Sequence, residues 1–168
     1  KTSVVFPGVT SRFAESIPGK IRSEFNISEN EKIVLDVGRI TKAKGVEDFG
    51  EIARRIAQTH EGYRFLFAGS DVNEDYGRKI RDRYGQYVTF IGQRTDLASV
   101  YADTDLLVHP SHREAASLVI IEAMEFGLPC IAWDLPGCDE LVAHGKNGSL
   151  IEFGDHTAMA ESIVSLLN

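Results

Sequence analysis

The chain has 168 residues, of which 43% are hydrophobic and 26% charged, and its net charge is −7. This length and composition suit one soluble globular domain, and they exclude a disordered or fibrous chain. The acidic balance argues against a nucleic-acid partner. Two cysteines are too few for a disulfide framework, and no apolar run approaches the roughly 20 residues that cross a bilayer. A cytoplasmic protein is therefore expected.

Six near-continuous apolar runs, rich in β-branched residues, predict strands that are buried on both faces. Between them, apolar residues recur three and four positions apart, which is the spacing of one helix face. The predicted strands are 32–38, 63–69, 87–92, 105–111, 129–134 and 148–153, and the predicted helices are 19–27, 46–60, 74–84, 96–104, 118–126 and one that begins at Asp155.

Strands that alternate with helices imply right-handed crossovers between parallel strands. We therefore predict a doubly wound, Rossmann-like α/β fold with helices on both faces of a parallel sheet. In such sheets a ligand binds beyond the carboxyl ends of the strands, so the loops that follow the strands are the candidate site.

The loop after the first predicted strand carries two cations beside the start of a helix. Gly38 ends the strand, Arg39 follows it, and Lys44 lies just before the helix that starts near Val46. Free backbone N–H groups and the helix dipole favour an anion there, which suggests a diphosphate site. A solvated loop with two ordinary surface cations explains this segment alone equally well. The Gly-Lys-Ser/Thr ending of a P-loop is missing.

The next two loops carry weaker signals. Gly69 ends a strand and allows either a turn or the close approach of a ligand. Ser70 and Asp71 are more typical of a helix cap than of a ligand contact. Gln93 and Arg94 fill a turn where backbone groups could read a nucleobase.

The segment HREAASLVIIEAMEFGLP, residues 112–129, places Glu114 just before a predicted helix and Glu122 inside it. The small residues 115–117 would leave backbone N–H groups open to a phosphate. At ~1.5 Å of rise per residue the two carboxylates are separated along the axis, so they do not form a proton-sharing dyad unless the loop doubles back. They either hold two parts of one extended ligand or are ordinary surface groups. Glu122 has apolar neighbours, and a buried carboxylate needs a polar partner such as a sugar hydroxyl.

The loop after the fifth predicted strand contains a Pro136-Gly137 turn. Asp139 and Glu140 are typical first-turn acids, so a short helix is expected to begin there. Gly137 could let the backbone approach a sugar.

Taken in order, these five segments resemble the C-terminal, donor-binding half of retaining GT-B-fold glycosyltransferases of the group 1 family, which includes glycogen synthase and mannosyltransferases. The resemblance extends from FPGV at 6–9 to NGSLIEFGD at 147–155. It implies a single nucleotide-sugar-binding domain over 1–168, with 1–13 as the remnant of a link to a missing N-terminal acceptor domain. The implied enzyme transfers a hexose from a UDP- or GDP-sugar to a glycan, lipid or other acceptor, with no metal or cofactor.

By resemblance, Arg39 and Lys44 would bind the donor diphosphate and stabilise its charge as the sugar departs. Glu114 would contact the transferred sugar, and Glu122 would hold the ribose hydroxyls. The N–H groups around residues 116–118 would meet the phosphates. Many members have a Gly-aromatic-Gly run where this chain has small residues, so its loop shape can differ. The remaining predicted contacts of the donor come from Gly38, Gly69, Ala116, Ser117, Leu118, Gln93 and Arg94.

Two other functions fit the sequence. One is a nucleotide-sugar 2-epimerase of the same fold, which would also need the missing half. The other is a non-catalytic nucleotide-binding or receiver-like module, although a receiver needs clustered acids where this chain has only Asp36. For a glycosyltransferase we expect the isolated chain to bind a nucleotide-sugar and to transfer nothing, with any membrane association made through the missing part.

Overall fold

The computed structural model describes residues 16–168, so the predicted link remnant at 1–13 lies outside the described residues. Six parallel strands form one sheet in the order β3-β2-β1-β4-β5-β6. This arrangement confirms the predicted parallel sheet. The strands are β1 Lys32–Val37, β2 Tyr63–Ala68, β3 Val88–Gly92, β4 Leu106–His109, β5 Cys130–Trp133 and β6 Gly148–Ile151.

A helix follows each strand except β5, whose connection to β6 is a run of turns. No helix within residues 16–168 is long and apolar enough to cross a membrane. The helices are α1 Lys20–Glu24, the short 3-10 helix η2 Lys42–Lys44, α2 Val46–Ala57, α3 Glu74–Tyr84, α4 Leu97–Ala102, α5 Leu118–Glu125 and α6 His156–Leu167.

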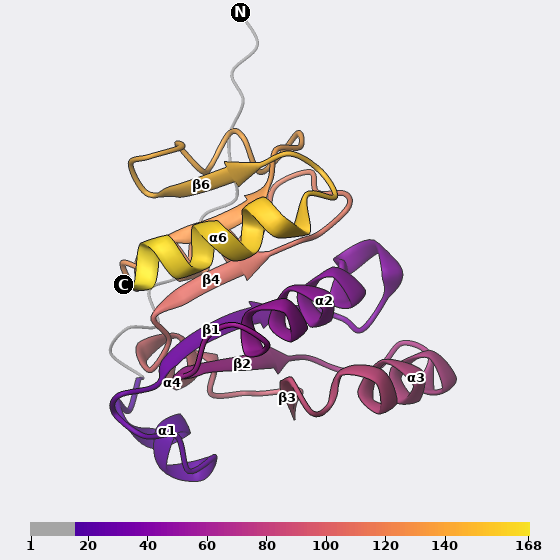
Figure 1. Cartoon of the computed structure of the whole chain (residues 1–168), viewed down its shortest axis with the longest axis vertical. Helices are drawn as coiled ribbons and strands as arrows, with labels where there is room; N and C mark the ends of the chain where they lie inside the picture. Colours follow the sequence, from indigo (N-terminus) through magenta and orange to yellow (C-terminus); the bar gives the residue numbers. More distant parts are fainter. Residues whose placement is uncertain (1–15) are drawn as a thin grey trace, which may run out of the picture.

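Two apolar layers cover the sheet because successive strand residues face opposite sides. Val34 packs with α2, α3 and α6, whereas its neighbour Leu35 packs with α1, α4 and α5. α2 and α6 lie side by side over the first of these faces (Figure 1). The fold is therefore the predicted doubly wound α/β arrangement.

The strand order has one reversal, between β1 and β4. From β1 the chain runs outward through β2 to β3, and it then returns to the other side of β1 to continue through β4, β5 and β6. In doubly wound sheets the helix layers diverge at such a switch point, and ligands bind in the crevice beyond the carboxyl ends of the strands there. The residues that follow these two strands are thus the first place to look for a ligand.

Two local predictions were wrong, and the N-terminal residue of one further helix does not act as an ordinary cap. The short helix expected at Asp139 and Glu140 is a series of turns over 136–141, in which Oδ1 of Asp139 accepts from the preceding N–H of Gly137 at 3.1 Å and caps no helix. Asn73, rather than Ser70 or Asp71, caps α3 by accepting from the N–H of Tyr76 at 2.9 Å. Asp96 occupies the N-cap position of α4 without a side-chain capping bond, because its carboxylate binds Arg94 and Lys20 instead.

Candidate functional site

Glycines lie side by side where the first three strands end: Gly38 follows β1, Gly69 follows β2, and Gly92 is the last residue of β3. The N–H of Gly38 donates to Ala68 at 2.9 Å, and that of Gly69 donates to Gly92 at 2.8 Å. A first side-chain carbon at position 69 would lie 1.6 Å from the carbonyl oxygen of Gly38. The close approach that Gly69 allows is therefore an approach of the chain's own backbone.

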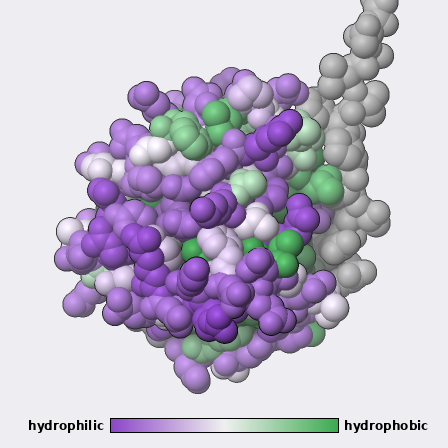
Figure 2. All heavy atoms as spheres, turned by 90° about the vertical axis from the view of Figure 1, so that its right-hand side faces the viewer, coloured by the Kyte–Doolittle hydropathy of each residue, from purple (hydrophilic) through white to green (hydrophobic). Residues whose placement is uncertain are grey.

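Beyond these glycines lies a shallow hollow of about 250 Å³. It belongs to the edge toward which the strands of Figure 1 point, and Figure 2 shows that this side of the molecule is largely hydrophilic. A polar ligand suits such a surface better than an apolar one. Five predicted site residues line the hollow together, namely Gly38, Arg39, Gly69, Gln93 and Arg94.

The two side chains that were predicted to border a base differ in their availability. Arg94 donates to both oxygens of Glu24 at 2.6 and 2.8 Å and to both oxygens of Asp96 at 2.8 and 2.9 Å. Hydrogen bonds with these two carboxylates raise the pKa of Arg94 further. Its guanidinium is thus occupied within the fold, whereas Gln93 is exposed.

The loop that carries both predicted phosphate-binding cations is locked to the loop that follows β4. The carbonyl oxygen of Ala43 accepts from the N–H of His112 at 2.9 Å and from Oγ of Ser111 at 3.1 Å. Gly45 has a φ of 66°, and a side chain there would lie 1.8 Å from the carbonyl oxygen of Pro110. The two loops flank the switch point and are held as one unit.

Within this unit, Lys44 and Glu114 form an ion pair with 2.5 Å between Nζ and Oε1. The aliphatic part of Lys44 lies 3.8 Å from where a side chain of Gly38 would begin, which connects this pair to the hollow. Arg39 is exposed and has no ion pair within residues 16–168. The chain therefore offers one partly neutralised and one unpaired cation at the crevice.

Behind Glu114 lie two charged groups that the sequence analysis did not single out as site residues. Nε2 of His109 is 2.8 Å from Oε1 of Glu114, and Nδ1 of His109 is 3.0 Å from Oδ1 of Asp36. The side chains of His109 and Asp36 are each 1% exposed, and that of Glu114 is 10% exposed. Asp36, His109, Glu114 and Lys44 thus form one continuous chain of contacts from the core to the surface.

The pKa values in this cluster respond to one another. Burial alone would lower the pKa of His109, but its bonds to Asp36 and Glu114 outweigh burial and raise it to about 9. Burial alone would raise the pKa of Glu114, but bonds from His109 and Lys44 hold it at about 2. Both shifts favour the charged form of the group at neutral pH.

The start of α5 faces the same edge. Ser117 is the N-cap, and its hydroxyl accepts from the N–H of Ile120 at 3.5 Å. The backbone N–H groups of Ala116, Ser117 and Leu118 donate to no group within residues 16–168. They are free donors at the positive end of a helix dipole.

Glu122 has a partner that the sequence did not indicate. The hydroxyl of Tyr101, which is 2% exposed, donates to Oε2 of Glu122 at 3.0 Å. No described contact joins Glu122 to Glu114, as expected for two carboxylates that do not share a proton. The polar partner expected for a carboxylate in this apolar helix is therefore supplied by the fold.

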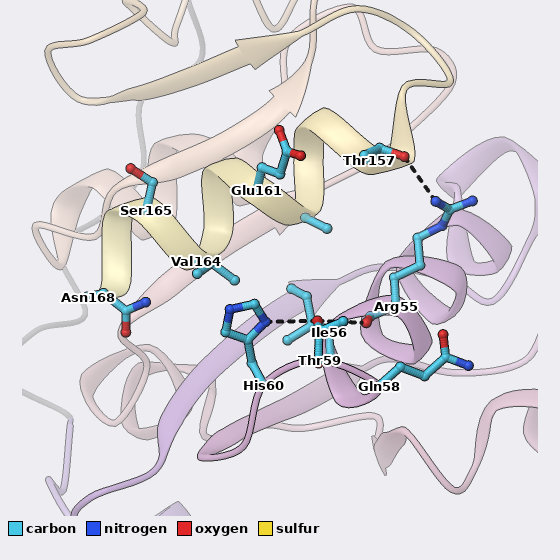
Figure 3. Close-up of a pocket in the computed structure, with 11 residues that line it drawn as sticks. Arg55, Ile56, Gln58, Thr59, His60, Thr157, Glu161, Val164, Ser165 and Asn168 are labelled. Carbon is cyan, nitrogen blue, oxygen red and sulfur yellow. Dashed lines mark hydrogen bonds between the residues drawn. The ribbon is translucent and has the colours of Figure 1, made fainter.

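Another hollow, of about 610 Å³, lies between the end of α2 and the length of α6 (Figure 3). Arg55 crosses one side of it and donates to Oγ1 of Thr157 at 3.0 Å. None of the predicted site residues lines it, and α2 ends there just before β2 begins, away from the carboxyl ends of the strands. Its position gives no reason to place a nucleotide there.

Comparison with known proteins gives consistent matches. The family model described as "Glycosyl transferases group 1" matches residues 19–168. The N-acetyl-alpha-D-glucosaminyl L-malate synthase of Bacillus anthracis is 32% identical over 154 residues, which cover 88% of this chain and 39% of that protein. Anabaena HepE, solved in complex with UDP and glucose, superposes with a TM-score of 0.80 at 27% identity over 89% of this chain and 42% of its own. WaaG, a glycosyltransferase involved in lipopolysaccharide biosynthesis, superposes with a TM-score of 0.80 at 26% identity, and the match covers 96% of this chain and 46% of WaaG. The chain spans less than half of the length of each of these proteins.

Proposed function

Because the chain belongs to the group 1 family of glycosyl transferases, we propose that it is the donor-binding domain of a retaining glycosyltransferase. The complete enzyme would transfer a hexose from a UDP- or GDP-sugar to a glycan, lipid or other acceptor held by an N-terminal domain. The observation that carries this proposal is the meeting of Lys44 and Glu114 at the switch point between β1 and β4. Nucleotides bind at such points in doubly wound sheets.

The donor diphosphate would lie between the two cations and the start of α5. An ammonium has three donors, and Lys44 gives one of them to Glu114, which leaves two for phosphate oxygens. Arg39 and the free N–H groups at 116–118 would supply the remaining contacts. Fixed positive groups of this kind stabilise the charge that develops on a departing diphosphate, so we propose that the enzyme needs no metal.

The two glutamates would hold the two sugars of the donor. Glu114, ionised and fixed by its partners, would accept from hydroxyls of the transferred hexose. Glu122 uses Oε2 for Tyr101, so Oε1 would be the atom that accepts from the ribose. Gln93 would border the base, whereas Arg94 would shape the hollow through its carboxylate partners. The similarity to HepE, solved with UDP-glucose, makes UDP the first nucleotide to test.

Calorimetric titration of the chain with UDP, GDP and ADP tests the proposal. Lys44→Ala should weaken UDP binding by about tenfold or more, the scale of a charge-assisted hydrogen bond. Lys42 lies in the same turn, is exposed and has no ion pair within residues 16–168, so Lys42→Ala is the matched control and should change affinity by less than about twofold. Chelation of divalent ions should leave the UDP affinity unchanged.

Two results would contradict this proposal separately. If none of the three nucleotides binds while circular dichroism shows an intact fold, the donor site is wrong. If Lys44→Ala binds UDP as the wild-type chain does, only the phosphate assignment fails. We also propose that the chain alone forms no glycosidic bond from UDP-glucose. If it formed this bond at a rate comparable with that of a two-domain relative, the proposal that transfer requires a second, acceptor-binding domain would be refuted.

A further inference from the structure

The contacts at the end of β4 point to a role for a residue that meets no ligand. We propose that His109 is a positioning residue, a buried imidazolium that keeps Glu114 ionised and fixes its orientation at the donor crevice. What Glu114 contacts rests on the proposed function, but the charge and geometry of His109 do not.

With both carboxylates ionised, the hydrogen bonds of His109 require two donors on its ring. Each ring nitrogen lies within 3.0 Å of a carboxylate oxygen, Oδ1 of Asp36 on one side and Oε1 of Glu114 on the other. An ionised carboxylate only accepts hydrogen bonds, and a neutral imidazole has only one N–H. A neutral ring would therefore leave a lone pair facing a carboxylate inside the protein, where an unpaired polar contact is costly.

The charges in the cluster balance only when His109 is protonated. Asp36 and Glu114 are then negative and His109 and Lys44 positive, so the four groups sum to zero at a site whose inner members, His109 and Asp36, are each 1% exposed. The N–H of Val37 also donates to Asp36 at 2.9 Å, which stabilises that carboxylate further. With a neutral His109 the two carboxylates would share a single cation, Lys44.

Two further titratable groups interact electrostatically with members of the cluster, namely Tyr101 on α4 and Cys138 in the turns after β5. Burial is the main cause that raises the pKa of each, so both are neutral at pH 7. The pKa of His109, raised to about 9, agrees with the hydrogen-bond pattern.

The consequence for the donor is a carboxylate whose position is set before the ligand arrives. The bonds from His109 and Lys44 both end on Oε1 of Glu114, and neither uses Oε2. Binding of a diphosphate by Lys44 would draw on the same ammonium, whereas the bond from His109 lies on the core side and would persist. A preorganised acceptor of this kind loses little on binding and discriminates well between sugar hydroxyl arrangements.

The first test reads the protonation of His109 directly. In the wild-type chain labelled with ¹⁵N at histidine, both ring nitrogens of His109 should carry protons at pH 7, with signals assigned by their loss in a His109 variant. Detection of a single ring proton at pH 7 would overturn the proposal without reference to any nucleotide.

The second test uses a variant that removes the charge with little structural damage. Asp36→Asn/His109→Gln replaces a buried ion pair by two neutral amides and leaves Glu114 without its imidazolium, whereas His109→Gln alone would leave Asp36 uncompensated and could fail to fold. In the double variant we expect UDP-glucose binding to weaken by about tenfold and UDP binding by less than about threefold. Glu114→Gln should cause the same selective loss, and adding it to the double variant should cause little more, since the effect of His109 passes through Glu114.

The outcomes separate the two proposals. A wild-type chain that binds neither UDP nor UDP-glucose contradicts the proposed function, while the ring-nitrogen measurement still decides the charge of His109. Suppose that the wild-type chain binds UDP. If the double variant then loses affinity for UDP and for UDP-glucose equally, or loses affinity for neither, the positioning role is wrong. Fully additive losses from Glu114→Gln and the double variant would also overturn it.

Discussion

Raising the pH from 6.5 to about 9 should weaken the fold, because the unfolded chain loses this histidine proton above about pH 6.5, whereas the folded chain keeps it on His109 up to about pH 9. The ordinary pKa of histidine is 6.5; burial would lower it, but the bonds to Asp36 and Glu114 raise it to about 9 in the folded chain. A group whose pKa is raised by folding stabilises the fold fully below its unfolded pKa and progressively less as the pH approaches the folded pKa. The contribution of His109 is therefore complete below pH 6.5 and lost above about pH 9.

The magnitude follows from the same values. At about 1.36 kcal/mol for each pKa unit, the rise from 6.5 to about 9 corresponds to roughly 3 kcal/mol of unfolding free energy. The attraction between His109 and Glu114 also affects the pKa of Glu114, which falls from 4.5 to about 2. The two values are not added, because each contains the attraction of the other charge. The stabilisation through Glu114 is present above pH 4.5 and is lost as the pH falls toward 2.

Urea unfolding, followed by the fluorescence of the single, buried tryptophan Trp133, measures this effect. Comparing the wild-type chain with Asp36→Asn/His109→Gln cancels the pH dependence of groups outside the cluster. The unfolding free energy of the wild-type chain minus that of the double variant should fall by about 3 kcal/mol between pH 6.5 and about 9. A difference that stays constant over this range would show that folding does not raise the pKa of His109, and would refute the reasoning.

Two further substitutions test how the crevice is built. Gly69→Ala should destabilise the chain by about 3 kcal/mol or more in urea unfolding, because the new carbon would meet the carbonyl oxygen of Gly38 at 1.6 Å. In the control Gly38→Ala, the new carbon would meet its nearest described neighbours only at 3.8 Å, so this substitution should change stability far less. Equal effects of the two substitutions would contradict the steric argument. Arg94→Ala should lower the free energy of unfolding by about 1 kcal/mol, the upper scale of partly exposed ion pairs, whereas Gln93→Ala should change it by less than about 0.5 kcal/mol. A loss of UDP affinity in Arg94→Ala as large as that in Lys44→Ala, with unchanged stability, would show that Arg94 binds the ligand directly.

Secondary structure was readable wherever one face or both faces of an element are buried. The first predicted strand, 32–38, differs by one residue from β1, and the predicted helix 46–60 contains all of α2. Predictions based on single capping residues were weaker, because a cap depends on where the backbone turns. Asp71 makes a bridge to Ile40 and an ion pair with Arg81, so the cap of α3 moves to Asn73.

The composition of the site was less accessible to sequence reasoning than its location. The loops were predictable because they follow apolar strands, but contacts between loops depend on which strands are neighbours. β1 pairs with β4 although some 70 residues of chain separate them, and no local pattern encodes that pairing. Asp36 and His109 therefore each resembled a single polar residue in an apolar run. A polar residue at the carboxyl-terminal part of two buried strands is the signal that could have joined them.

Glu122 illustrates how a partner within the fold changes what a charged residue implies. From sequence, a carboxylate in an apolar helix favoured a ligand that would satisfy it, but the hydroxyl of Tyr101 already donates to it. Its place in the helix therefore has a structural explanation that needs no ribose. Arg39 presents the opposite case, since it is exposed at the switch point and has no ion pair within residues 16–168. The physical case for a donor site is thus stronger at the cations, where positive charge remains available, than in the spacing of the two glutamates.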